Sequence, residues 1–229
     1  MTGFVVPVQR ATIESNLNAI RDRMVAAAER SGRTADAVTL VAVTKTVGIE
    51  EVGILHDLGV RDFGENRLQV AEPKITAFKR EAVWHMIGPI QRRKAKDVVR
   101  LFHRADAIDR VEVAEALQKR CEEADTNLPV LIEVNVSGEM TKHGFTPDDL
   151  SDAIERVGEL SRLKVDGFLT MAPFFEDIEQ TRPVFRRLRE LADVHDLSTV
   201  SMGMTNDFEV AIEEGATQVR IGSALFEGE

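Results

Sequence analysis

The amino-acid sequence predicts a single closed (β/α)8 barrel that spans residues 1–229. Three observations support this. Eight short aliphatic segments recur along the chain, a helix-like segment separates each from the next, and the connections are only a few residues long. Strict alternation of strands and helices implies a parallel sheet, and eight such units imply a closed barrel. An open doubly wound sheet is the alternative fold, but no glycine-rich dinucleotide-binding turn follows the first strand.

The first half of the chain holds four predicted strands. Residues 9–31 carry apolar side chains at helical spacing and end at Ser31–Gly32, which predicts a helix that can occupy an outer position of the barrel. Val38–Lys45 is a run of aliphatic and β-branched residues, typical of a strand buried on both faces. The elements expected next are a helix at 49–58, a strand at 60–63, a helix at 68–80, a strand at 83–87, a helix at 91–100 and a strand at 105–108.

The second half repeats the pattern. Asp109 is expected to cap a helix, with Glu112 as its capping-box partner. The clearest strand is Pro129–Val136, and Thr146–Pro147 is expected to begin the next helix because proline is tolerated in the first helical position. The remaining elements are a strand at 164–170, a helix at 178–194, a strand at 199–202, a helix at 206–213, a strand at 217–221 and a terminal helical turn from Gly222–Ser223.

Composition narrows the classes of function. The chain has 29 basic and 39 acidic residues, a net charge of −10, so we expect neither nucleic acid nor a membrane surface as a partner. The lone cysteine, Cys121, excludes an internal disulfide and fits a reducing compartment. We find neither a signal peptide nor a stretch of membrane-spanning length, which predicts a cytoplasmic protein.

Lys45 is the first candidate reactive residue. It ends an apolar strand, and an amine held in apolar surroundings tends to lose its proton and become a nucleophile toward carbonyl carbons. A lysine that merely caps a strand and reaches water is the ordinary alternative, and taken alone it would be favoured.

Polar residues collect at the predicted C-terminal ends of the strands, where barrels of this type carry their chemistry. The loops after the last two strands read SMGMTND and RIGSALF, and this is the usual phosphate site of the fold. Gly203 and Gly222 permit close backbone approach, and Thr205 and Ser223 supply hydroxyl groups. The other strand-end candidates are Lys45, Asn66, His85, Ser201, Met202 and Arg220.

A phosphate site across a barrel mouth from a lysine fits a ligand that carries both a phosphate and an aldehyde. Pyridoxal 5′-phosphate (PLP), held as a Schiff base, is one such ligand. A phosphosugar aldolase would need the same pair of groups. Arg220 helps to discriminate, because it precedes the phosphate turn and could face a pyridine nitrogen.

At this point the sequence resembles the pyridoxal phosphate homeostasis proteins, the YggS/PROSC group, whose fold is similar to the N-terminal barrel of alanine racemase without its second domain. The resemblance covers about residues 10–226 and is carried by VAVTK, FGEN, WHMIGPIQ, EVNVS, KHG, SMGMTND and VRIGSALF. It implies that Lys45 forms the Schiff base with PLP and that Arg220 contacts the pyridine nitrogen. It further implies that the phosphate is held by Ser201, Thr205, Gly222 and Ser223, that Asn66, His85, Met202 and Met204 lie near the ring, and that Lys142 lies near the mouth.

Two positions depart from the pattern of that family. Thr205 stands where serine is usual, and the hydroxyl is retained. Gln91-Arg92-Arg93-Lys94 stands where the family usually reads Q-x-N-K, so the role of that asparagine is open here. Since the whole chain is acidic, a solvated helix face is the favoured interpretation of this basic cluster over a polyanion site.

The residues favour a binding protein over an enzyme. An arginine beside the pyridine nitrogen favours its unprotonated form and weakens PLP as an electron sink, and the chain contains no tyrosine to act as a second base. We therefore expect a PLP carrier or buffer in vitamin B6 homeostasis, a monomer or weak homodimer, with PLP-dependent apoenzymes as candidate recipients. The alternatives are a small PLP-dependent racemase with His85 or Lys142 as second base, and a Schiff-base aldolase. The five histidines lack metal-ligand spacing, so no metal is expected.

Overall fold

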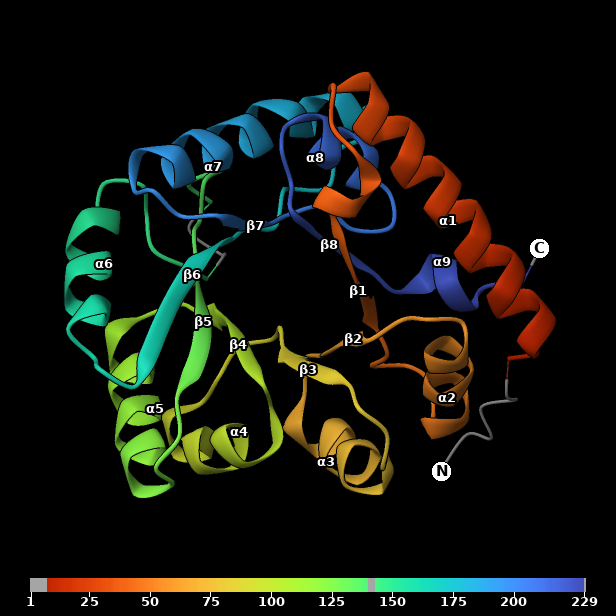
Figure 1. Cartoon of the computed structure of the whole chain (residues 1–229). Helices are drawn as coiled ribbons and strands as arrows, with labels where there is room; N and C mark the ends of the chain where they lie inside the picture. The colour runs from red at the N-terminus through yellow and green to blue at the C-terminus, as the bar shows by residue number, and fades with distance from the viewer. Residues whose placement is uncertain (1–7, 140–142, 229) are drawn as a thin grey trace.

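In the computed structural model, which describes residues 8–139 and 143–228, the chain folds into a closed barrel of parallel strands (Figure 1). Within these residues eight strands follow one another around the barrel in chain order, and the last pairs with the first. The predicted (β/α)8 barrel is confirmed. The strands are β1 (Thr39–Val43), β2 (Asp62–Glu65), β3 (Val83–Met86), β4 (Arg104–Ile108), β5 (Leu128–Glu133), β6 (Leu163–Leu169), β7 (Thr199–Ser201) and β8 (Gln218–Ile221).

Helices surround the barrel, and one α-helix follows each of these strands (Figure 1). The first helix precedes β1 and lies against the last two helices, so it occupies an outer position as the sequence predicted. The helices are α1 (Arg10–Arg30), α2 (Ile49–Asp57), α3 (Leu68–Ala77), α4 (Ala95–Leu101), α5 (Val111–Glu123), α6 (Leu150–Gly158), α7 (Arg182–Val194), α8 (Phe208–Glu213) and α9 (Ser223–Phe226).

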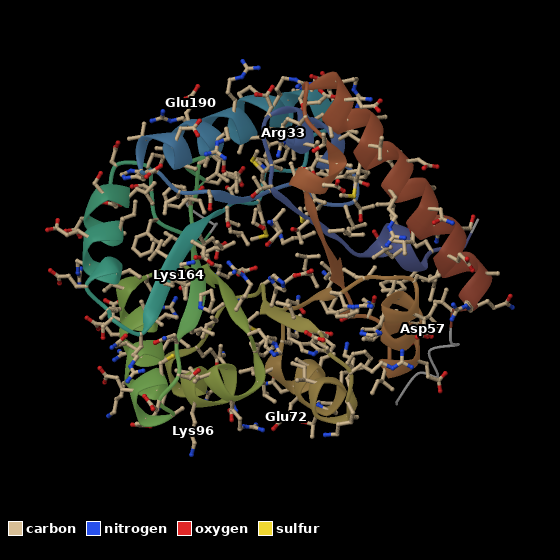
Figure 2. The ribbon with its side chains drawn as sticks, viewed as in Figure 1. Arg33, Asp57, Glu72, Lys96, Lys164 and Glu190 are labelled. Atoms are coloured by element: carbon tan, nitrogen blue, oxygen red, sulfur yellow. The ribbon has the colours of Figure 1, made fainter. Side chains whose placement is uncertain are left out.

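The apolar core lies between the sheet and the helices. Its largest fully buried side chains include Phe63 and Phe168 from strands and Phe185 and Phe208 from helices. Charged side chains take the opposite faces of the helices, as Figure 2 shows for four that lie at the periphery: Asp57, Glu72, Lys96 and Glu190. The apolar stripe of each helix is therefore turned toward the sheet, as helical spacing predicts.

The inside of the barrel is unusually polar. Gln218 Nε2 donates to Asp106 Oδ2 over 3.1 Å, and because β8 and β4 are not neighbours this bond crosses the barrel. Both side chains are buried. Branched apolar residues usually fill the interior of such barrels, so a polar interior requires a specific reason.

Two predicted helix starts are wrong. The helix α5 begins at Val111, and Asp109 accepts a bond from Arg110 Nη1 instead of capping it, so the expected capping box does not form. The helix α6 begins at Leu150 and not at Thr146–Pro147. Phe145 pairs with the extended backbone beyond β5, and a turn that Thr146 and Asp149 close by hydrogen bonds then leads into α6.

We predict that Gly167→Ala destabilises the fold. Gly167 faces Thr199 across β6 and β7, and an added Cβ would overlap the carbonyl oxygen of Thr199, so the pairing must shift. The free energy of unfolding, measured with denaturant, should fall by about 1–3 kcal/mol. The matched control is Gly158→Ala at the end of α6, where a Cβ meets no atom within 4 Å and stability should be unchanged or slightly higher. Equal stability of the two variants would contradict this.

Candidate functional site

A cavity of about 680 Å³ opens at the C-terminal ends of the strands. Its walls come from the loops after β1, β2, β3, β6, β7 and β8, and its volume falls in the range of small-molecule and cofactor sites, roughly 300–1,000 Å³. This is the end at which the sequence placed the chemistry. The predicted site residues that line it are Lys45, Asn66, Met204, Thr205, Arg220, Gly222 and Ser223.

Lys45 lies just beyond the end of β1, and its side chain is exposed in the cavity. The sequence argument that apolar surroundings withdraw this amine from water therefore does not apply here. The amine makes no hydrogen bond or ion pair with any residue that the structure describes. An accessible amine without a competing partner is suited to react with a carbonyl ligand.

A buried ion pair lies directly beneath Lys45. Lys74 Nζ on α3 lies 2.5 Å from Glu65 Oε1 at the end of β2, and both side chains are almost fully buried. Glu65 Oε1 also accepts from Thr44 Oγ1 over 2.6 Å, and Lys74 Nζ donates to the carbonyl oxygens of Thr44 and Val47. These bonds hold the backbone on both sides of Lys45. We infer that this pair fixes where the reactive amine emerges.

Arg220 on β8 is buried, yet it lines the cavity. Its Nη1 donates to Ser201 Oγ over 2.7 Å and its Nη2 to the carbonyl oxygen of Thr170 over 2.9 Å. It forms no ion pair with a carboxylate of the described chain, which is uncommon for a buried arginine. Burial lowers the pKa of Arg220, and the nearby charge of Asp106 opposes this shift. The guanidinium therefore offers positive charge to the cavity.

The loops after β7 and β8 approach each other across the rim. Gly203 has φ of 88°, and a side chain there would collide with Phe208 and Ala211 on α8, so glycine is required. The hydroxyls of Ser223 and Thr205 lie 3.2 Å apart, and Gly222 precedes the first turn of α9. Hydroxyl groups beside a helix start are suited to binding a phosphate.

Asn66 is half-buried and follows β2. It is fixed by close packing of Gly88, because a Cβ at Gly88 would collide with the backbone of Asn66. Gly88, in the loop after β3, therefore allows the backbone of Asn66 to pack closely against it, which the sequence did not reveal.

Three predicted residues lie elsewhere. His85 was expected beside the ring, but it lines a second cavity, near the N-terminal ends of the strands, together with Asp62 and Gln218. The stagger of the barrel is the reason, since His85 pairs with Arg104, the first residue of β4. Met202 was also expected there, but it follows the inward-facing Ser201 and points into the outer core, where it is fully buried. Ser201 does not line the cavity either and contacts Arg220 instead.

Other residues of the site were missed. Asp207 lines the cavity and accepts from the backbone N–H of Met204 over 2.6 Å, and burial raises the pKa of its carboxyl group. Phe174 lies at the rim with 85% of its surface exposed. The apolar run around Phe174 follows a strand, and this position was the only signal that could have found it. Lys142 lies outside the described residues.

Two other features bear on partners. Arg92 and Arg93 are exposed ahead of α4, as expected of a solvated face. No helix in the described part of the chain is long and apolar enough to cross a bilayer. The same residues hold no group of three or more His, Cys, Asp or Glu side chains placed to bind a metal ion.

Comparison with known proteins identifies the family. A family model described as the N-terminal domain of alanine racemase matches residues 15–229. A protein of Aquifex aeolicus named pyridoxal phosphate homeostasis protein is 41% identical over 217 residues, which are 92% of this chain and 95% of that protein. The protein of the same name from Escherichia coli K12 is 36% identical over 227 residues, 93% of this chain and 95% of that protein. The chain belongs to the pyridoxal phosphate homeostasis protein family.

Solved structures agree with this family assignment. PipY of Synechococcus elongatus PCC7942, whose structure is described as having PLP bound, is 27% identical and superposes with a TM-score of 0.82 over 94% of this chain and all of that one. Alanine racemase of Clostridium difficile 630 superposes with a TM-score of 0.77 at 14% identity, over 99% of this chain but 60% of the racemase. At that identity the likeness concerns the fold alone.

We predict that Lys74→Met strongly destabilises this family member. The substitution leaves the fully buried Glu65 carboxylate without its cation, and breaking a buried pair from one side costs about 3–5 kcal/mol. Denaturant unfolding measures the loss. Adding Glu65→Gln to the same chain should recover part of it. Lys96→Met on the exposed face of α4 is the control and should change stability by less than about 0.5 kcal/mol. Wild-type stability of Lys74→Met would contradict a structural role for the pair.

Proposed function

We propose that this protein binds PLP through a Schiff base to Lys45 and takes part in intracellular PLP homeostasis as a carrier or buffer. One observation carries the proposal: an amine with no partner among the described residues, a buried arginine and a pair of hydroxyl groups line the same cavity. These are the three kinds of group that an aldehyde, a pyridine nitrogen and a phosphate require. The pyridoxal phosphate homeostasis relatives support the same ligand.

The site residues fit the parts of the ligand. Thr205, Ser223 and the backbone at Gly222 are proposed to bind the phosphate. Arg220 is proposed to donate to the pyridine nitrogen, because it lines the cavity and its bonds to Ser201 and Thr170 leave other guanidinium N–H groups unused. Asn66 is proposed to contact the ring. Ser201 serves by holding Arg220, which replaces the direct phosphate contact expected from the sequence.

We propose that the protein holds PLP without robust catalysis. PLP supplies an electron sink when bound, and this sink is strongest when the ring nitrogen is protonated. Arg220 can only donate at that nitrogen, so it favours the unprotonated form. The racemase alternative needs a second base, and His85 is not available for this because it lies outside the cavity. Lys142, the other candidate, lies outside the described residues.

The route of delivery follows from the exposed position of Lys45. An amine from another protein could reach the carbon held by Lys45, so a C–N bond to that amine would form, the C–N bond to Lys45 would break, and a proton would pass from the incoming amine to the leaving Lys45 amine. PLP-dependent apoenzymes are the proposed recipients. The barrel alone is the proposed working unit, as a monomer or weak homodimer in the cytoplasm.

We predict that protein given PLP gains a visible absorption band and that Lys45→Ala abolishes it. Borohydride reduction followed by intact mass and peptide mapping should locate the added mass on Lys45. Lys96→Ala, a lysine on the outside of α4, is the matched control and should keep both signals. A band that survives in Lys45→Ala would contradict the proposed attachment. A cofactor-free aldolase would react with a carbonyl substrate but show no such band.

The carrier and racemase interpretations can be separated by activity. Wild-type protein loaded with PLP should show no amino-acid racemisation or transamination above a free-PLP control. Turnover that disappears in Lys45→Ala would overturn the carrier interpretation and favour the racemase.

A further inference from the structure

A continuous series of hydrogen bonds runs through the inside of the barrel, and we name it the interior chain. Its members are Asp62, His85, Asp106, Gln218, Ser201 and Arg220. At one end, His85 bonds to two carboxylates, with 3.0 Å from its Nε2 to Asp62 Oδ1 and 2.7 Å from its Nδ1 to Asp106 Oδ2. Gln218 Nε2 then donates to Asp106 Oδ2 over 3.1 Å and to Ser201 Oγ over 2.9 Å. At the other end, Arg220 Nη1 donates to Ser201 Oγ over 2.7 Å.

The interior chain joins two cavities. One end reaches a polar cavity of about 310 Å³ at the N-terminal ends of the strands, which is lined by Asp62, His85 and Gln218. The other end, Arg220, lines the proposed cofactor cavity. Between them the side chains are buried, with His85 at 2% exposure and Asp106 and Ser201 at 0%. Burying so many polar groups is unfavourable unless each is hydrogen-bonded, and here each of them is.

The donors and acceptors of the interior chain have a fixed order. Asp106 is ionised and only accepts, so Gln218 must turn its amide nitrogen toward it. The second N–H of that nitrogen then goes to Ser201 Oγ. Ser201 Oγ accepts this bond and a second from Arg220 Nη1, which occupies both of its lone pairs. The orientation of the arginine is therefore coupled to that of Asp106.

His85 supplies the positive charge that balances the buried Asp106 carboxylate, a charge that Arg220 would otherwise have to supply. Burial acts to lower the pKa of His85, but the carboxylates of Asp106 and Asp62 outweigh it, so the pKa is raised above its usual value. Burial acts to raise the pKa of Asp106, yet the charges of His85 and Arg104 lower it overall. The charge of His85 in turn adds to the burial that lowers the pKa of its neighbour His103.

The charged groups that act on His85 and Arg220 come from several strands. Around His85 they are Asp62 on β2, Arg104 and Asp106 on β4, and His103 before β4; Arg104 in turn pairs with Asp166 on β6. Around Arg220 they are Asp106, Asp207 and Glu133. Asp106 is the one carboxylate that both sets share, so the two cations compete for it.

We propose that the interior chain holds the Arg220 guanidinium toward the cofactor cavity, and that His85 is the positioning residue on which this depends. With His85 charged, Asp106 is satisfied by His85 and Arg104, and Arg220 keeps its neutral partners. Without that charge, Asp106 attracts Arg220 inward and weakens its contact with the ligand. The inference rests on the proposed function, because it assigns Arg220 to the pyridine nitrogen.

We predict that His85→Gln, which can keep a hydrogen bond but loses the charge, binds PLP about tenfold more weakly than wild type. The visible band of the PLP-loaded wild type should change with pH around an inflection above about 6.5, and this inflection should be absent in the variant. His56→Gln on α2, outside the barrel, is the control and should match wild type. NMR titration of His85 in protein without PLP measures the same pKa independently.

Stability gives a further readout. Because the folded-state pKa of His85 is raised, its contribution to stability is present below about 6.5 and is lost as pH rises through the folded value. The stability advantage of wild type over His85→Gln should shrink over that range. If His85→Gln fails to fold, Asp62→Asn at the partly exposed end of the interior chain replaces it, and there the inflection should move to lower pH.

The outcomes separate the two proposals. Wild type that binds no PLP overturns the proposed function, whatever the His85 titration shows. If wild type binds PLP and His85→Gln has the same affinity and the same pH profile, only the role proposed for the interior chain is overturned. A weaker variant whose pH inflection is unchanged also overturns it, because His85 would then be structural only.

Discussion

The pairing of β1 with β8 is the contact on which the site depends. Val41 lies opposite Arg220 and Ala42 opposite Ile221, so the two ends of the chain meet side by side in the sheet. Since both strands run in the same direction, whatever follows Val43 must face whatever follows Ile221 across the rim. Lys45 and the turn at Gly222 are brought together by backbone hydrogen bonds and not by contact with each other. A cofactor site here therefore requires barrel closure, and no half of the chain could form it.

Closure of the barrel brings the polar groups of the rim together but does not fix where their side chains point. Hydrogen bonds of buried charged residues fix these orientations. Beneath Lys45, the pair of Glu65 and Lys74 holds the turn that carries the amine. Beneath the cavity, Ser201 and the carbonyl oxygen of Thr170 hold Arg220. Each device places a reactive or charged group by hydrogen bonds to backbone or hydroxyl, which are short and directional. The apolar core outside the barrel contributes stability but could not set these directions.

The barrel and the site residues at its rim could be predicted because alternation and strand ends are visible in sequence. His85 and Met202 could not be placed. The alternation of side chains along a strand shows which face of the sheet a residue occupies. It does not show the offset between neighbouring strands, which decides the height of a residue along the barrel axis, so His85 was predicted at the wrong end of the interior. Met202 follows Ser201 by one residue and so takes the opposite face. Lys74 gave no signal, because a lysine in an amphipathic helix is ordinarily exposed.

The partners of Arg220 bear on why this barrel would hold a cofactor without driving catalysis. A carboxylate partner would neutralise the guanidinium and reduce its effect on a nearby ring nitrogen. Here the partners are a serine hydroxyl and a backbone carbonyl, which orient the cation without cancelling its charge. Asp106, an interior carboxylate whose charge acts on Arg220, is engaged by a histidine, a glutamine and a second arginine. The polar interior thus keeps a positive charge beside the cavity, and a ring nitrogen placed against that charge, as proposed for PLP, would be disfavoured from taking up a proton.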